Sequence, residues 1–166
     1  MFKYLLSAFM VMSILTACNG GDEEPVNPPK KLGDGQPKFV KEGELTFMDA
    51  ANNPIISIDI EIAESPAEQQ QGLMYRSFMR NDNGMLFIFE RDEPRAFWMH
   101  NTIIPLDIIY VNSKMEIVSI AQDTQPYSDE SIRSNGPAMY VIEVNSGFSV
   151  QYGLKPGVKV QFAKMW

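Results

Sequence analysis

The residues of this chain with the greatest capacity for chemistry lie near its middle. Trp98 offers a flat apolar surface, and Asn101 and Thr102 offer hydrogen-bonding groups in a predicted loop. Asp107 lies just inside an apolar segment, where an unpaired charge would be costly to bury. Arg76 is the natural partner for Asp107, because its planar guanidinium can hold a carboxylate through two parallel hydrogen bonds.

This constellation supports two hypotheses. In the first, Arg76 and Asp107 form a structural lock that ties a helix to a sheet. In the second, Trp98 and Phe97 form the flat apolar wall of a pocket in which polar groups orient a ligand such as a sugar or a peptide. Those polar groups would be Arg76, Asn101, Thr102 and Asp107. The sequence alone does not choose between them.

A hydrolase acting on glycans or cell-wall fragments is an alternative function. Glycoside hydrolysis requires two carboxylates that flank the scissile bond, and Asp107 and Glu143 could supply them. Glu143, however, alternates with apolar neighbours near the end of a strand, which is typical of a solvated or salt-bridged residue. No catalytic residue is therefore assigned.

Copper handling is a second alternative. Met74, Met79, Met85 and Met99 lie near His100 in the sequence, and thioethers with an imidazole suit Cu(I). None of these residues repeats at a tight ligand spacing, and methionine commonly fills gaps in cores. The sequence therefore predicts neither a metal site nor a cofactor.

The amino-terminal segment reads as an export signal. Lys3 is followed by uncharged, mostly apolar residues up to Ala17, a run too short to span a bilayer as a helix. The segment Leu15–Cys18 resembles the lipobox of bacterial lipoproteins, which implies cleavage after Ala17 and a lipid on the Cys18 thiol. Residues 1–17 are then a signal peptide, and Cys18 anchors the protein to a membrane of the cell envelope. An ordinary signal peptide that leaves Cys18 as a free thiol is the rival interpretation.

Residues 18–37 form a predicted flexible linker. This segment is rich in Gly and Pro, carries the acidic run Asp22–Glu24 and contains few apolar residues. The acidic run is similar to surface-export signals of Bacteroidota lipoproteins, so both the periplasmic face and the cell surface remain open as locations.

Composition excludes other classes of function. The chain has 14 basic and 21 acidic residues and a formal net charge of -7, which does not favour nucleic-acid binding. Its single cysteine cannot form an internal disulfide and, once acylated, could not act as a nucleophile.

Residues 38–166 are predicted to form a single β-rich domain. Isoleucines alternate with polar residues from Ile56 to Ile62, which is typical of a half-buried strand. Further short apolar segments are separated by turn signals: residues 85–89, 106–111, 116–121, 139–144 and 158–162. The pattern predicts a mainly β fold, an antiparallel sandwich, jelly-roll-like or barrel-like domain with one or two short helices.

One helix has a clear start signal. Ser65 is a predicted N-cap, Pro66 occupies the first helical position, and Glu68 is placed to bond back to the cap. Apolar residues then recur on one helical face as far as Phe78, which would place Arg76 near the end of the helix. A shorter helix is predicted between residues 146 and 153.

Several blocks of sequence carry a family resemblance. They are Gly72-Leu73-Met74-Tyr75-Arg76, Gly84-Met85-Leu86-Phe87-Ile88-Phe89, residues 97–107, residues 136–143 and residues 153–157. Together they resemble the bacterial and archaeal domain-of-unknown-function 192 family. The resemblance implies a compact, β-rich, jelly-roll-like domain that is commonly exported, and it implies no reaction. The sequence therefore predicts an envelope lipoprotein whose domain binds or scaffolds an unidentified small molecule, glycan or peptide.

Overall fold

The computed structural model describes residues 37–165. The predicted signal peptide, Cys18 and nearly all of the predicted linker lie outside these residues. In chain order the elements are β1 (Gly43–Met48), β2 (Pro54–Ala63), α1 (Pro66–Gln71), β3 (Asn83–Phe97), β4 (Leu106–Val111), β5 (Ile117–Thr124), β6 (Ile132–Asn145), α2 (Phe148–Gln151) and β7 (Lys159–Lys164). No helix in the described part of the chain is long and apolar enough to cross a membrane.

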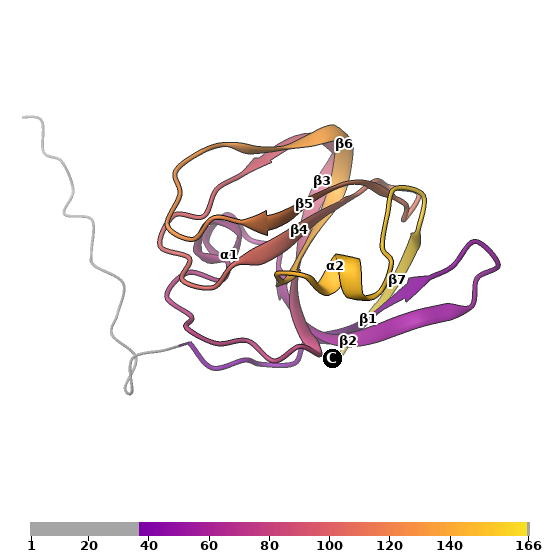
Figure 1. Ribbon diagram of the computed structural model, residues 1–166, viewed down its shortest axis with the longest axis horizontal. Helices are drawn as coiled ribbons and strands as arrows, with labels where there is room; N and C mark the ends of the chain where they lie inside the picture. Colours follow the sequence, from indigo (N-terminus) through magenta and orange to yellow (C-terminus); the bar gives the residue numbers. More distant parts are fainter. Residues whose placement is uncertain (1–36, 166) are drawn as a thin grey trace, which may run out of the picture. The chain divides into compact units, whose positions relative to one another are not determined.

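The strands form one curled sheet in the order β5-β4-β6-β3-β2-β1-β7, and the curl makes a half-barrel (Figure 1). The two outermost strands approach each other through a bridge between Glu116 and Lys159. The mainly β, barrel-like prediction is therefore confirmed. One pairing departs from the antiparallel prediction: β2 and β3 run parallel, because the chain crosses over through α1 between them.

The concave side of the sheet encloses the larger core. Ile58 and Ile60 are buried there, and Ile56 and Ile62 pack against the same cluster, so the predicted alternation in β2 is confirmed. Phe148 of α2 reaches this core and lies with its ring centroid 5.9 Å from that of Phe47. The other buried members are Leu45, Leu86, Ile109, Val111, Ile117, Ile142, Val144, Leu154, Val158 and Val160.

A second core covers the opposite face of the central strands. It contains Leu73 and Met99, from the connections that precede β3 and β4, packed on strand residues. The strand residues of this cluster are Ala63, Met85, Phe87, Leu106, Ile108, Tyr110, Ala138 and Val141. Because both faces of the central strands are covered, every residue of β4 is buried, which explains its continuous apolar sequence.

Helix α1 begins as predicted and ends earlier. The Glu68 amide donates to the Ser65 hydroxyl at 3.3 Å, and the Ser65 amide donates to the Glu68 carboxylate at 2.8 Å. The helix stops at Gln71, since Gly72 has a φ of 44° and a ψ of -134° and so leaves helical geometry. The prediction of a helix through Arg76 is therefore wrong. Residues 72–76 instead pass over the outer face of the sheet, and this path sets the position of Arg76.

Candidate functional site

Arg76 is paired with a residue that the sequence did not suggest. Its guanidinium donates to the carboxylate of Glu61 on β2, and both side chains are buried, each with 7% of its surface exposed. The Nε atom of Arg76 is buried without a hydrogen-bond partner among the described residues. The alternation in β2 predicts Glu61 on an open polar face. Glu61 is buried because the segment after α1 covers that face.

Asp107 does not contact Arg76 and serves a different purpose. Its carboxylate is fully buried and accepts hydrogen bonds from the backbone amides of Asp123 (3.0 Å), Gly147 (3.3 Å) and Ser149 (2.8 Å). The Ser149 hydroxyl adds a fourth bond at 2.6 Å. The predicted Arg76–Asp107 lock is wrong: Asp107 holds the turn that leads into α2.

The strand register also rejects the predicted pair of catalytic carboxylates. Glu143 lies directly opposite Ile108, and Asp107 lies directly opposite Val144. Residues that lie directly opposite share a face, and successive residues alternate between faces. Asp107 and Glu143 therefore point to opposite sides of the sheet and cannot flank one bond, which removes the hydrolase hypothesis in the form proposed.

Glu143 is the residue with the most unusual surroundings. Only 5% of its surface is exposed, so the expectation of a solvated strand residue is wrong. Burial raises the pKa of its carboxyl from 4.5 to about 8, although the positive charge of Arg76 acts in the opposite direction. No residue in the range 37–165 forms a hydrogen bond or an ion pair with this carboxyl, and Arg76 acts on it only through its charge.

Strand pairing places the two buried glutamates in one row across the sheet. Met85 of β3 lies opposite Glu61 on one side and Glu143 on the other. Since neighbouring strands are about 4.8 Å apart, the backbones of the two glutamates are separated by about two such spacings. Arg76 neutralises Glu61, and Glu143 is left as the unpaired member of the row.

A pocket of about 260 Å³, called here the Glu143 pocket, opens above this carboxyl. Its lining residues are Gln69, Gln70, Gln71, Gly72, Leu73, Met74, Phe87, Phe89, Ala96, Phe97, Trp98, Thr102 and Glu143. Four of them are aromatic, and Glu143 is the one acid or base among these described residues. Gly72 keeps the pocket open, because a Cβ atom there would lie 3.2 Å from the Phe87 ring and 4.0 Å from the Glu143 carboxylate.

The predicted site residues do not come together in one site. Trp98 and Thr102 line the Glu143 pocket, whereas Arg76 and Asp107 line two other hollows. Asn101 fixes the loop, since its side-chain amide donates to the Tyr75 hydroxyl at 2.8 Å. The sequence therefore located one wall of the pocket and missed the carboxyl at its floor as a binding group.

Trp98 is half-exposed and held by its neighbours. Its ring stacks on that of His100 with centroids 5.1 Å apart, and His100 pairs with Asp129 through Nδ1 at 2.6 Å.

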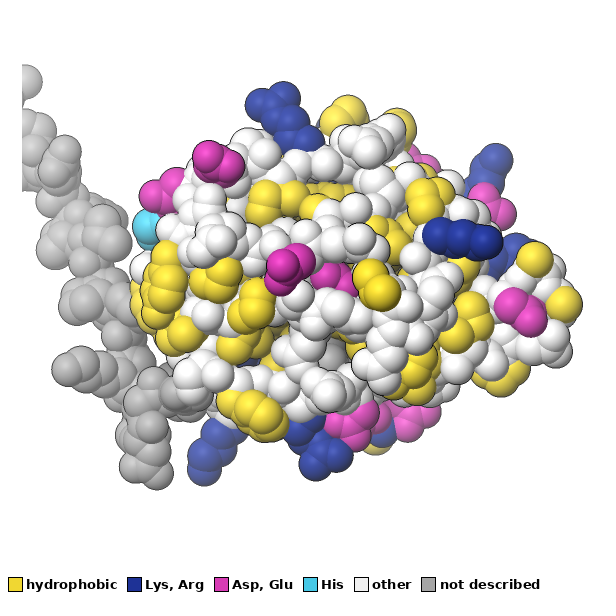
Figure 2. All heavy atoms as spheres, in the orientation of Figure 1, with side chains coloured by type: hydrophobic (Ala, Val, Ile, Leu, Met, Phe, Trp, Pro, Cys, Tyr) yellow, Lys and Arg dark blue, Asp and Glu magenta, His cyan; other side chains and the backbone are white. Residues whose placement is uncertain are grey.

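Phe78 is another exposed aromatic residue, at a separate location. Figure 2 shows Lys and Arg side chains mainly at the periphery of one face, with hydrophobic side chains exposed between them.

Most methionines of the copper hypothesis belong to the second core. Met79, Met85 and Met99 are buried there among aliphatic and aromatic side chains. The sulfur of Met99 accepts a hydrogen bond from the Thr124 hydroxyl at 3.1 Å. Among residues 37–165, no group of three or more His, Cys, Asp or Glu side chains is placed to hold a metal ion.

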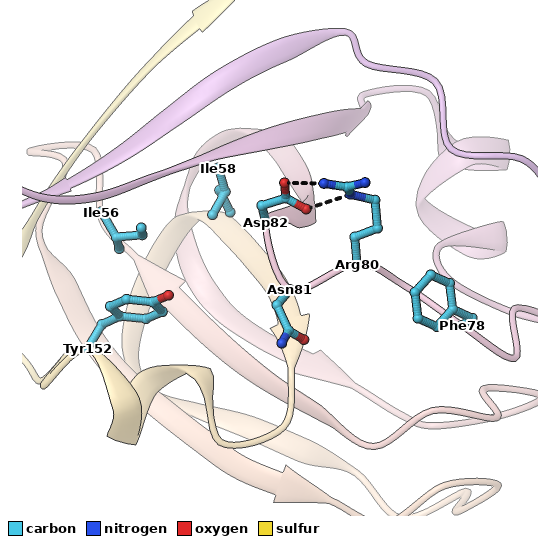
Figure 3. Close-up of a pocket in the computed structure, with 7 residues that line it drawn as sticks. All are labelled: Ile56, Ile58, Phe78, Arg80, Asn81, Asp82 and Tyr152. Carbon is cyan, nitrogen blue, oxygen red and sulfur yellow. Dashed lines mark hydrogen bonds and ion pairs between the residues drawn. The ribbon is translucent and has the colours of Figure 1, made fainter.

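A larger hollow of about 420 Å³ lies elsewhere on the surface (Figure 3). It is lined by Ile56, Ile58, Phe78, Arg80, Asn81, Asp82 and Tyr152. Its two charged side chains pair with each other, because Arg80 donates to Asp82 at 2.8 and 2.7 Å. Its polar chemistry is therefore satisfied internally, which makes the Glu143 pocket the stronger candidate for ligand binding.

Comparison with known proteins agrees with this fold. The family DUF192, described as an uncharacterized ACR, matches residues 48–162. The chain belongs to this family. No protein with a curated description matches the sequence.

Two crystal structures of similar proteins support the same assignment. One is a protein from Sinorhizobium meliloti, described as a candidate transcription regulator, with 32% identity and a TM-score of 0.70. That match covers 76% of this chain and 98% of the other. The second is a protein of unknown function from Novosphingobium aromaticivorans, with 35% identity, a TM-score of 0.67 and coverage of 71% and 83%.

The buried pair gives a stability prediction. Arg76→Met leaves the Glu61 charge buried without a partner, and we expect it to lower the free energy of unfolding by about 3–5 kcal/mol. Adding Glu61→Gln should recover most of this loss, because both charges are then absent. The control is Arg80→Met, which breaks an exposed pair and should cost less than about 1 kcal/mol. Urea denaturation measures all four proteins, and equal losses in the two single variants would contradict the role of the pair.

Glu143 gives a pH prediction. The folded protein retains the proton of this carboxyl up to about pH 8, whereas the unfolded chain loses it above about pH 4.5. The free energy of unfolding should therefore fall as pH rises between these values, by an amount on the order of a few kcal/mol. In Glu143→Gln this contribution is absent, so the difference between the two stability curves isolates it. Parallel curves in urea titrations from pH 5 to pH 8 would refute the prediction.

Proposed function

We propose that this chain is an exported, lipid-anchored protein of the cell envelope whose β domain binds a small ligand in the Glu143 pocket. The observation that carries the proposal is a carboxyl, 5% exposed, that lines an aromatic pocket without a partner among the described residues. Burying such a group costs stability, and strongly shifted acids in pockets are characteristic of functional sites.

Binding accounts for the pocket better than catalysis does. Asp107 lies on the opposite face, and Glu61 is already paired with Arg76. Glu143 therefore lacks a second free carboxylate beside it, which a glycosidase would need. The aromatic wall that ends at Trp98 suits contact with a small organic molecule.

The anchor is supported by the sequence. Cys18 follows Leu15-Thr16-Ala17 at the end of the apolar segment, and residues 19–37 would place a tether between a lipid and the domain. Two or more acyl chains on one residue give stable membrane attachment, whereas a single chain is marginal. The envelope location follows from this anchor.

The anchor is tested by mass spectrometry of the amino-terminal peptide after expression in a bacterium. We expect the mature chain to start at Cys18 and to carry the added mass of acyl chains. Cys18→Ser, which differs by one atom, should move the protein from the membrane fraction to the soluble fraction. An unmodified Cys18 thiol in the wild-type protein would refute the lipoprotein assignment.

Ligand binding is tested with a panel of monosaccharides, dipeptides and small amines, observed by NMR. Compounds that bind should lose about tenfold or more in affinity in Trp98→Ala, because the variant removes an aromatic wall of the pocket. Phe78→Ala is the matched control: it also removes an exposed aromatic side chain, but from the separate hollow. Equal effects of the two substitutions, or no binding at all, would contradict a binding role for the Glu143 pocket.

A further inference from the structure

The Glu143 pocket combines one carboxyl with several aromatic rings. Phe97 packs edge-on against Phe87 and Phe89, with ring centroids 5.0 and 6.4 Å apart. Trp98 continues the lining toward solvent. Aromatic faces carry partial negative charge and attract cations, and the carboxyl at the floor adds a full negative charge when it ionises.

The charges around the Glu143 carboxyl indicate the sign of the charge on a ligand that would pair with it. Arg76 is the cation that acts on Glu143, and its charge is already neutralised by Glu61. No Lys or Arg occurs among the described residues that line the Glu143 pocket. Tyr110 of β4 also interacts with Glu143, and burial raises the pKa of its hydroxyl, so it stays neutral. Ionised Glu143 is therefore left with one uncompensated negative charge.

The lack of hydrogen-bond donors to Glu143 also favours a positively charged ligand. The Glu143 carboxyl receives no hydrogen bond from the described residues, and a buried carboxylate needs donors to be stable. A primary ammonium group supplies both a positive charge and N–H donors. Phe89, an aromatic residue of the pocket, already contacts a cation within the protein. The guanidinium of Arg95 lies 4.0 Å from its ring centroid.

We propose that the ligand of the Glu143 pocket carries a primary ammonium group, which pairs with the Glu143 carboxylate while its carbon skeleton packs against Phe87, Phe97 and Trp98. This inference rests on the proposed binding function and adds the chemical class of the ligand. A pocket of about 260 Å³ restricts the buried part to a small group, such as an alkylammonium, an arylalkylammonium or the end of a lysine-like side chain.

Binding of this kind releases a proton. In the free protein the carboxyl is mostly protonated at pH 7, because burial raises its pKa to about 8. The incoming ammonium keeps its own proton and favours the ionised carboxyl, so the proton of Glu143 passes to the buffer. The apparent affinity should rise about tenfold per pH unit as pH increases toward 8, and then level off.

The experiment uses benzylammonium and its uncharged counterpart, benzyl alcohol, titrated into the full-length protein by calorimetry. The measurements are made at pH 6 and pH 8 and, at pH 7, in two buffers with different ionisation enthalpies. We expect benzylammonium to bind more than tenfold tighter at pH 8 than at pH 6. We also expect it to release nearly one proton at pH 7, and benzyl alcohol to bind weakly and without dependence on pH.

Two variants test the role of the carboxyl. Glu143→Gln keeps the shape of the neutral acid, so it should stay folded by circular dichroism while losing both the affinity for benzylammonium and the proton release. Glu130→Gln removes the same charge from an exposed position and should leave both unchanged, which separates pairing in the pocket from attraction to an acidic protein.

The remaining outcomes separate this inference from the proposed function. Equal affinity for benzyl alcohol and benzylammonium, with no effect of Glu143→Gln, would overturn the ammonium class and leave the binding function standing. Absence of benzylammonium binding would overturn the ammonium class as well. If the wider panel also shows no binding that depends on Trp98, both the inference and the proposed function fail.

Discussion

The buried ion pair between Arg76 and Glu61 is the interaction on which the outer face of the sheet depends. It fixes the segment after α1 against β2 and lines a hollow that shares Gln71 and Gly72 with the Glu143 pocket. Because a buried pair gains little over apolar packing, its presence is poorly explained by stability alone. The pair also balances the charge of Arg76 with that of Glu61, so an ionised Glu143 leaves the three residues with one net negative charge.

The path of the chain over this face follows from two local features. The capping box at Ser65 and Glu68 starts α1, and Gly72 ends it after less than two turns. A side chain at Gly72 would be strained by the positive φ and would approach the ring of Phe87. The same glycine therefore both turns the chain toward Arg76 and keeps the Glu143 pocket open. Local conformation and pocket shape are coupled at a single residue.

The sequence predicted the structural features that depend on residues close together in the chain. It missed the contacts that depend on pairing across the sheet. Alternation in β2, the apolar run of β4 and the cap at Ser65 are local signals, and each is confirmed. The partner of Arg76 is not a local property. Asp107 interrupts an apolar run, whereas Glu61 occupies a polar position of an alternating strand and meets Arg76 because the segment after α1 passes over it. The burial of Glu143 is not a local property either, because it depends on a covering segment about seventy residues away.

Three buried acids of the sheet are compensated in different ways, and the difference separates structural roles from a functional one. Asp107 receives four hydrogen bonds and holds the turn before α2, so its burial is compensated by the fold itself. Glu61 is compensated by Arg76. Glu143 has neither kind of compensation and is also the acid that lines an aromatic pocket. A fold under selection for stability alone would replace Glu143 by an apolar residue, since the neighbouring Val141 and Ile142 are buried without cost. Its retention at the floor of a pocket is best explained by a partner that arrives from outside.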